Sequence, residues 1–128
     1  MLVYSKKDCG GVKLSNNFTV SEFACKDGAD VVIVDELLVH ILQNVRDYFK
    51  KPVHITSAYR TPSHNKSVGG ATYSLHIYGK AADFTVDGVA AAKVQEYLEI
   101  ALPNTGGIGK AANYTHVDTR AIKARWTY

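Results

Sequence analysis

Two separate stretches of this sequence contain the side chains that could bind a metal ion together. His76 and Asp83 lie seven positions apart in the run S-L-H-I-Y-G-K-A-A-D, and His116 begins the triplet H-V-D near the C-terminus. Two neutral imidazoles and one carboxylate are the ligands that a catalytic zinc ion uses while its fourth position stays open for water. The sequence therefore predicts a site for one Zn²⁺ ion with hydrolytic chemistry.

The local sequence suggests how these side chains are brought together. Gly79 lies between His76 and Asp83, where glycine lets the backbone turn sharply, and the apolar run 81–86 is typical of a buried strand. Residues 115–119 alternate with a period of two, so His116 and Asp118 should project from the same face of a short strand. We therefore expect a loop that doubles back onto a strand and directs its side chains to one point.

The spacing of these residues also resembles a known motif. The pattern S-x-H-x-x-G-x-A-x-D followed by H-V-D is similar to that of the zinc D-Ala-D-Ala carboxypeptidase and L-alanyl-D-glutamate endopeptidase family, whose members cut peptidoglycan stem peptides. Each further matching stretch is weak evidence alone, but their shared order along nearly the whole chain is strong evidence. The stretches that resemble the compact branch of this family are 18–25, 57–62, 64–65, 68–71, 106–109 and 123–126.

The resemblance implies roles for individual residues. It implies that His76, Asp83 and His116 are the zinc ligands. It also implies that Arg60, in the stretch S-A-Y-R-T-P, faces the metal-bound substrate and stabilises its developing negative charge. Ser74 and Tyr59 are candidates for hydrogen bonds around the ligands or the substrate.

The general base is the point at which this chain departs from the family pattern. Several relatives carry a catalytic acid or imidazole two or three positions before the last ligand, where this chain has Tyr114 and Asn113. Asp118 is the substitute candidate for a catalytic base. It could equally be an acceptor that holds Arg120 or a neighbouring imidazole in place, and the sequence leaves both alternatives open.

Composition and charge restrict the class of protein. The chain has 128 residues, of which 46% are hydrophobic, and this predicts a single domain over residues 1–128. Its net charge of +3 comes from scattered lysines and arginines, a distribution that argues against a nucleic-acid partner. No apolar run is long enough to insert into a membrane, and the N-terminus does not resemble an export signal. We expect a soluble monomer that is made in the cytoplasm and acts on the bacterial cell wall.

The remaining histidines and cysteines give weaker signals. No spacing ties His40, His54 or His64 to the three predicted ligands, so we expect them to be exposed or hydrogen-bonded imidazoles. Cys9 and Cys25 are either a disulfide or two free thiols, and neither lies beside a histidine at a zinc-ligand spacing. The glycines of the stretch 106–109 are expected to let the backbone approach a substrate closely.

Periodicity and turn signals predict an α+β domain. Apolar residues recur at helical spacing in 35–50 and in 89–102, which predicts two helices, the first capped by Asp35. Residues 52–57 have the composition of a strand. We expect a mostly antiparallel sheet with helices packed on one side and the zinc site at the sheet.

These observations support one main functional hypothesis and two alternatives. The main one is a zinc metallopeptidase that removes a terminal D-Ala from peptidoglycan stem peptides or cuts their L-Ala to D-Glu bond, as a phage-type endolysin would. The first alternative is a catalytically impaired, zinc-containing module that binds the cell wall, because Asn113 stands where relatives carry an acid. The second is a structural part of a phage particle that docks on the wall.

Overall fold

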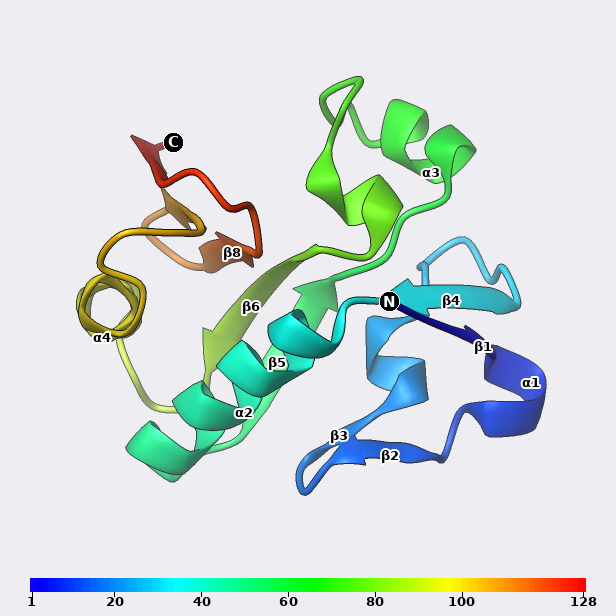
Figure 1. Cartoon of the computed structure of the whole chain (residues 1–128), viewed down its shortest axis with the longest axis horizontal. Coiled ribbons are helices and arrows are strands. Elements are labelled where there is room, and N and C mark those ends of the chain that lie inside the picture. Colours follow the sequence, from blue (N-terminus) through cyan, green and yellow to red (C-terminus); the bar gives the residue numbers. More distant parts are fainter.

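The architecture is a five-stranded sheet with two long helices on one face and a small N-terminal cap (Figure 1). The computed structural model describes all residues, 1–128. In chain order, with η for 3-10 helices, the elements are β1 (Leu2–Ser5), α1 (Lys6–Cys9), β2 (Lys13–Ser15), β3 (Phe18–Thr19), η1 (Val20–Phe23), β4 (Val31–Val34), α2 (Glu36–Phe49), β5 (Val53–Ser57), α3 (Pro62–Ser67), η2 (Leu75–Tyr78), β6 (Ala81–Val86), α4 (Ala91–Ala101), β7 (Gly107–Lys110), β8 (Thr115–Asp118) and β9 (Ala124–Thr127).

The central sheet has the strand order β5-β6-β8-β7-β9. All neighbouring strands are antiparallel except β7 and β9, which are parallel. Two further antiparallel pairs, β1 with β4 and β2 with β3, lie in the N-terminal cap. The expected α+β domain with a mostly antiparallel sheet is therefore confirmed.

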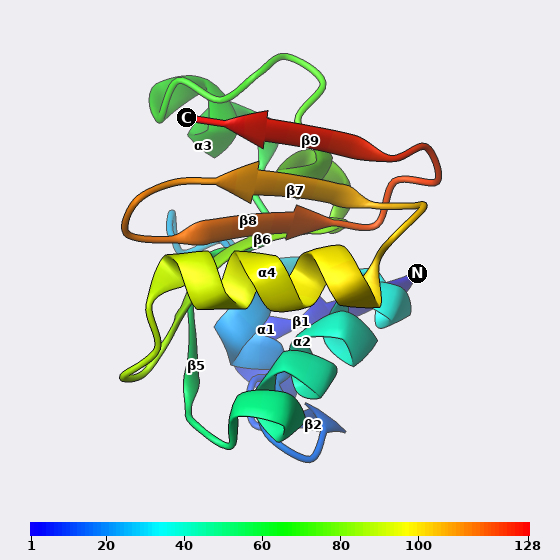
Figure 2. The same cartoon turned by 90° about the vertical axis from the view of Figure 1, so that its left-hand side faces the viewer.

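The two long helices cover the same face of the sheet. Helix α2 contacts β5 and β6, helix α4 contacts β6, β7 and β8, and Figure 2 shows α4 lying across the sheet with α2 beside it. Strand β6 directs Ala82, Phe84 and Val86 into this core, where they meet leucines of both helices. Because side chains alternate along a strand, Asp83 faces the opposite side of the sheet.

The main helices begin and end close to their predicted bounds. Asp35 caps α2 by accepting a hydrogen bond from the Leu37 backbone N–H at 3.0 Å, and Lys50 ends the helix in the left-handed conformation. Helix α4 is shorter than the predicted 89–102 because it begins only at Ala91. No helix combines the length and the apolar character that crossing a bilayer requires.

The N-terminal cap completes the core under α2. Phe18, Val20 and Phe23 are almost fully buried in the same apolar cluster as the two long helices. Cys9 and Cys25 are free thiols, which is one of the two predicted alternatives. At the other end of the chain, the tail adds β9 to the sheet edge, a strand that the sequence did not predict.

Candidate active site and metal centre

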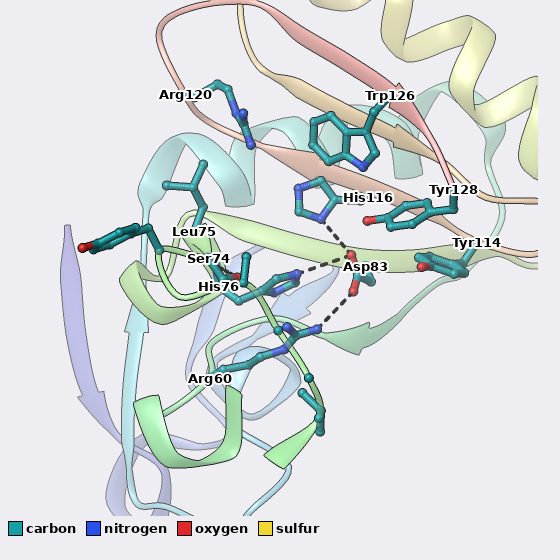
Figure 3. A pocket seen from close by; sticks show the side chains of 15 residues that line it. Arg60, Ser74, Leu75, His76, Asp83, Tyr114, His116, Arg120, Trp126 and Tyr128 are labelled. Carbon is teal, nitrogen blue, oxygen red and sulfur yellow. Dashed lines mark hydrogen bonds and ion pairs between the residues drawn. The ribbon is translucent and has the colours of Figure 1, made fainter. Parts of the chain in front are cut away.

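An open cleft of about 470 Å³ lies on the face of the sheet opposite the two long helices. Its floor holds all three predicted ligands, and aromatic side chains line one of its walls (Figure 3). The charged, polar and aromatic lining residues are Arg60, Tyr73, Ser74, His76, Asp83, Tyr114, His116, Arg120, Trp126 and Tyr128.

His76 is positioned by the short helix η2 and by a backbone carbonyl. Ser74 caps η2, since its hydroxyl accepts a hydrogen bond from the His76 backbone N–H at 3.2 Å. The ring Nδ1 lies 2.7 Å from the carbonyl oxygen of Ala58, an acceptor, so Nδ1 carries the proton and Nε2 has a free lone pair. That Nε2 points to Asp83 Oδ1 at 3.4 Å.

Gly79 ends η2 in the left-handed conformation, with φ of 69°. A Cβ there would lie 2.3 Å from the carbonyl oxygen of Ile33, so the turn requires glycine for space as well as for its backbone angle. This confirms the sharp turn predicted between His76 and Asp83.

Asp83 and His116 lie directly opposite each other on the neighbouring strands β6 and β8. His116 Nδ1 is 2.9 Å from Asp83 Oδ1. Burial alone would raise the pKa of Asp83, but the His116 hydrogen bond and the nearby His76 imidazole hold it well below its ordinary value. One ligand atom from each of the three residues lies within 4.8 Å of the other two. The fold therefore places two imidazoles and an ionised carboxylate around one point.

Asp118 lies behind His116 and outside the cleft. Its Oδ2 is 2.8 Å from His116 Nε2, and its side chain has no exposed surface. The carboxylate also accepts hydrogen bonds from Arg120 Nε at 2.8 Å, from Arg120 Nη2 at 2.8 Å and from the Gly107 backbone N–H at 3.0 Å. Burial would raise its pKa, but the His116 and Arg120 hydrogen bonds hold it well below the usual range. Of the two predicted alternatives, this geometry favours the acceptor that orients a neighbouring imidazole.

The glycines of β7 make room for these side chains. A Cβ on Gly107 would lie 2.2 Å from Asp118 Oδ2, and a Cβ on Gly109 would lie 2.7 Å from the indole nitrogen of Trp126. Between them, Ile108 points into the core. We expected these glycines to allow a close approach of substrate, but in the structure they allow a close approach of Asp118 and Trp126.

Arg60 reaches the site from the loop after β5. Its Nε donates to Ser57 Oγ at 3.0 Å, Nη1 donates to Asn65 Oδ1 at 3.2 Å, and Nη2 donates to Asp83 Oδ2 at 3.5 Å. A guanidinium has five N–H donors, so these contacts fix its plane and leave two donors free. Because Arg60 lines the cleft next to Asp83, those donors are available to a bound molecule.

The ligand geometry fits a zinc ion. Each imidazole has one nitrogen directed at Asp83 and its other nitrogen held by an acceptor, the Ala58 carbonyl or Asp118. This pattern is typical of metal-binding histidines, because the outer acceptor fixes the tautomer and the ring orientation. Two nitrogens and one oxygen at the floor of an open cleft leave a fourth position accessible.

Comparison with known proteins assigns the chain to a family. A family model described as Peptidase M15 matches residues 16–118. The chain belongs to the peptidase M15 family. This confirms the predicted resemblance, and all of the stretches that carried it except 123–126 lie within the matched residues.

Two curated proteins are similar to this M15 chain over part of its length. It is 38% identical over 78 residues to the probable peptidoglycan L,D-endopeptidase MepK of Haemophilus influenzae, covering 56% of this chain and 41% of that protein. It is 35% identical over 77 residues to the peptidoglycan L,D-endopeptidase MepK of Escherichia coli K12, covering 55% of this chain and 41% of that protein. The similarity thus spans about two fifths of the length of these relatives.

The M15 site contains some predicted residues and lacks others. Ser74 lines the cleft and caps η2, whereas Tyr59 is buried outside the cleft, and its backbone N–H donates to the Phe23 carbonyl. Neither Asn113 nor any carboxylate other than Asp83 lines the cleft. Reasoning from sequence missed the Ala58 carbonyl and did not place the aromatic wall, because neither has a signal in spacing or composition.

The Asp118→Asn variant is expected to lower the affinity for zinc by about 10- to 100-fold, because it weakens the hydrogen bond between position 118 and His116 Nε2 that orients the imidazole. At saturating zinc, the rate of the variant should return to within a few-fold of wild type. Zinc titration and rate measurement at several zinc concentrations would test this. Asp87→Asn, at an exposed carboxylate in the turn after β6, is the matched control. A fall in kcat that zinc cannot restore would instead identify Asp118 as the general base.

The Gly107→Ala variant is expected to destabilise the fold by about 1–3 kcal/mol, because the new methyl group overlaps the Asp118 carboxylate, which His116 and Arg120 hold in place. Thermal unfolding would measure this loss. Gly11→Ala is the control, since no atom lies within 4 Å of a Cβ at that position. Equal melting temperatures for the two variants would show that Asp118 can move at little cost.

Proposed function

We propose that this chain is a zinc-dependent peptidase that hydrolyses peptide bonds in peptidoglycan stem peptides. The observation that carries this proposal is the convergence of His76, Asp83 and His116 on the floor of an open cleft. The family assignment and the names of the two relatives support peptidoglycan as the substrate. Because both names specify an endopeptidase, cleavage of an internal bond, such as L-Ala to D-Glu, is favoured over removal of a terminal D-Ala.

The residues of the cleft have chemical roles that suit peptide hydrolysis. A zinc ion, when bound, lowers the pKa of water to about 7 and polarises a carbonyl group. Arg60 presents a fixed, permanently charged group beside Asp83, where it would stabilise negative charge that develops on the carbonyl oxygen. Ala58 and Asp118 keep the two imidazoles in the orientation that binds a cation.

The aromatic wall suits the binding of an extended peptide. Tyr114, Trp126 and Tyr128 form a continuous group, with ring centroids of neighbours 5.5 Å and 6.4 Å apart. Arg120 lies over the Trp126 ring at 5.1 Å from its centroid, and its charge is balanced by Asp118. The wall would therefore contact substrate mainly through aromatic faces and hydroxyl groups.

A catalytically impaired wall-binding module is the second candidate function. The observation that favours it is that Asp83, itself a proposed ligand, is the only carboxylate lining the cleft. A peptidase of this geometry would have to move the proton of the attacking water without a dedicated carboxylate base. Bound zinc without turnover would support this second candidate.

Mass spectrometry of purified peptidoglycan fragments, before and after incubation with zinc-loaded protein, would test the proposal. A product that has lost D-Ala identifies a carboxypeptidase, and separation at L-Ala to D-Glu identifies an endopeptidase. His116→Ala protein in the same assay controls for contaminating hydrolases. The absence of any new product with the zinc-loaded wild type would contradict the peptidase proposal. Action as an endolysin and the monomeric state remain predictions that this assay does not address.

A further inference from the structure

A second group of potential metal ligands lies outside the cleft. Cys25, Asp27 and His64 each have one ligand atom within 4.8 Å of those of the other two. Cys25 and Asp27 follow η1 in the N-terminal cap, and His64 lies in α3. Figure 1 shows α3 above the loop that leads into β4. None of the three lines the cleft that contains His76, Asp83 and His116.

Thr61, which follows Arg60 and caps α3, connects the members of this group. Its backbone N–H donates to Cys25 Sγ at 3.4 Å, and its hydroxyl donates to Asp27 Oδ2 at 2.7 Å. The same hydroxyl accepts a hydrogen bond from the His64 backbone N–H at 3.2 Å. Thr61 therefore fixes the Cys25 and Asp27 side chains beside the start of α3, the helix that carries His64.

The hydrogen bonding and exposure of the group suit a cation. The Thr61 hydroxyl and the Ala29 backbone N–H donate hydrogen bonds to the Asp27 carboxylate at 2.7 Å and 2.9 Å, which fixes its orientation. The Cys25 thiol is free and almost fully buried, and the His64 ring makes no hydrogen bond to the protein. Asp27 is exposed and His64 is half-buried, so an ion can enter from the solvent side.

We propose that Cys25, Asp27 and His64 bind a second Zn²⁺ ion. A sulfur, a nitrogen and an oxygen suit a borderline-soft cation, whereas Ca²⁺ and Mg²⁺ require oxygen ligands. The thiol releases its proton to solvent when the ion binds, and a water molecule completes the coordination. No sequence spacing indicates this site, because His64 is distant from Cys25 and Asp27 in the chain and meets them only in the fold.

This second ion would link the N-terminal cap, through Cys25 and Asp27, to the start of α3, through His64. Thr61 bonds to Cys25 and follows Arg60 directly in the chain. Asn65 in α3 accepts a hydrogen bond from Arg60. Zinc at this site would therefore stabilise the segment that positions Arg60 without contacting the cleft. Binding of this second ion does not require the proposed peptidase activity.

Titration with Co²⁺, followed by absorption spectroscopy, would test the second site. A sulfur-to-cobalt charge-transfer band is expected in the wild type, because Cys25 supplies a thiolate that the His76, Asp83 and His116 site lacks. The band should persist in Cys9→Ser, the matched thiol control, and in His116→Ala, and it should disappear in Cys25→Ser. His64→Ala and Asp27→Asn should each weaken the Co²⁺ affinity that the band reports by about 100-fold or more, because loss of a ligand exceeds the cost of losing an outer hydrogen bond.

Several results would overturn the second site. These are the absence of the band in the wild type, its loss in Cys9→Ser, and an unchanged affinity in His64→Ala. Should Cys25→Ser fail to fold, His64→Ala decides the matter, because His64 is half-buried and its ring has no other protein partner. Failure of the peptidase proposal gives a different pattern, namely an unchanged band without any peptidoglycan product.

Discussion

Replacing His116 with alanine is expected to reduce hydrolysis of peptidoglycan fragments by at least about a thousandfold, more than the loss of a single charge-stabilising donor would cost. His116 is the residue that joins Asp83 to Asp118, so its loss removes one ligand and the support behind it. The zinc content measured by mass spectrometry should fall by one ion per chain. Product formation followed by liquid chromatography gives the rate.

The fold of the His116→Ala variant should survive, which makes the result interpretable. Asp118 keeps its hydrogen bonds with Arg120, and Asp83 keeps its contacts with Arg60 and His76, so neither carboxylate loses all of its partners. His40→Ala, at an exposed imidazole of α2, is the matched control and should retain full activity. Circular dichroism would confirm the fold of both proteins.

Removing zinc with a chelator is an independent way to test whether activity requires the metal ion. Wild-type protein stripped of metal should lose activity to the same extent and recover when Zn²⁺ is restored, whereas His116→Ala should not recover. If the His116→Ala variant kept its full zinc content and its activity, His116 would be excluded as a ligand. Recovery of wild type only with another divalent ion would keep the ligand set and change the metal.

The elements that position the site were predictable where local signals decide structure. The helical spacing of apolar residues and the Asp35 cap gave the bounds of α2 to within a residue, and Gly79 predicted the turn before β6. The pairing of Asp83 with His116 was not predictable in the same way. It depends on the register between two strands that are separated by α4 and β7, and local sequence does not determine such a register.

The roles of Tyr59 and Asp118 show the limit of reasoning from neighbours. Tyr59 was a candidate for a hydrogen bond around the ligands or the substrate, but successive residues of an extended chain point to opposite sides, so Tyr59 is buried while Arg60 reaches the cleft. The period of two correctly placed Asp118 on the same face as His116. It could not tell whether the carboxylate would face the cleft or the far side of the imidazole, because that depends on Arg120 and on the space left by Gly107.

Replacing Arg60 with alanine is expected to lower kcat by about 100- to 1,000-fold, because a fixed donor beside the reacting carbonyl acts mainly in the transition state. The zinc content should not change, since Arg60 contacts Asp83 through Oδ2 while both imidazoles approach Oδ1. Steady-state kinetics on a purified stem peptide, with metal analysis of the same samples, would separate these effects. Arg46→Ala in α2, far from the cleft, is the matched control.

The Arg60→Lys variant distinguishes charge from geometry at this position. Lysine keeps the positive charge but lacks the planar fork that donates to Ser57, Asn65 and Asp83 together. If the orientation of the two free N–H groups matters, Arg60→Lys should recover only a small part of the lost rate. A rise in KM with unchanged kcat would instead mean that Arg60 binds the ground state and the transition state equally. In that case the charge on the carbonyl oxygen would have to be stabilised by the metal alone.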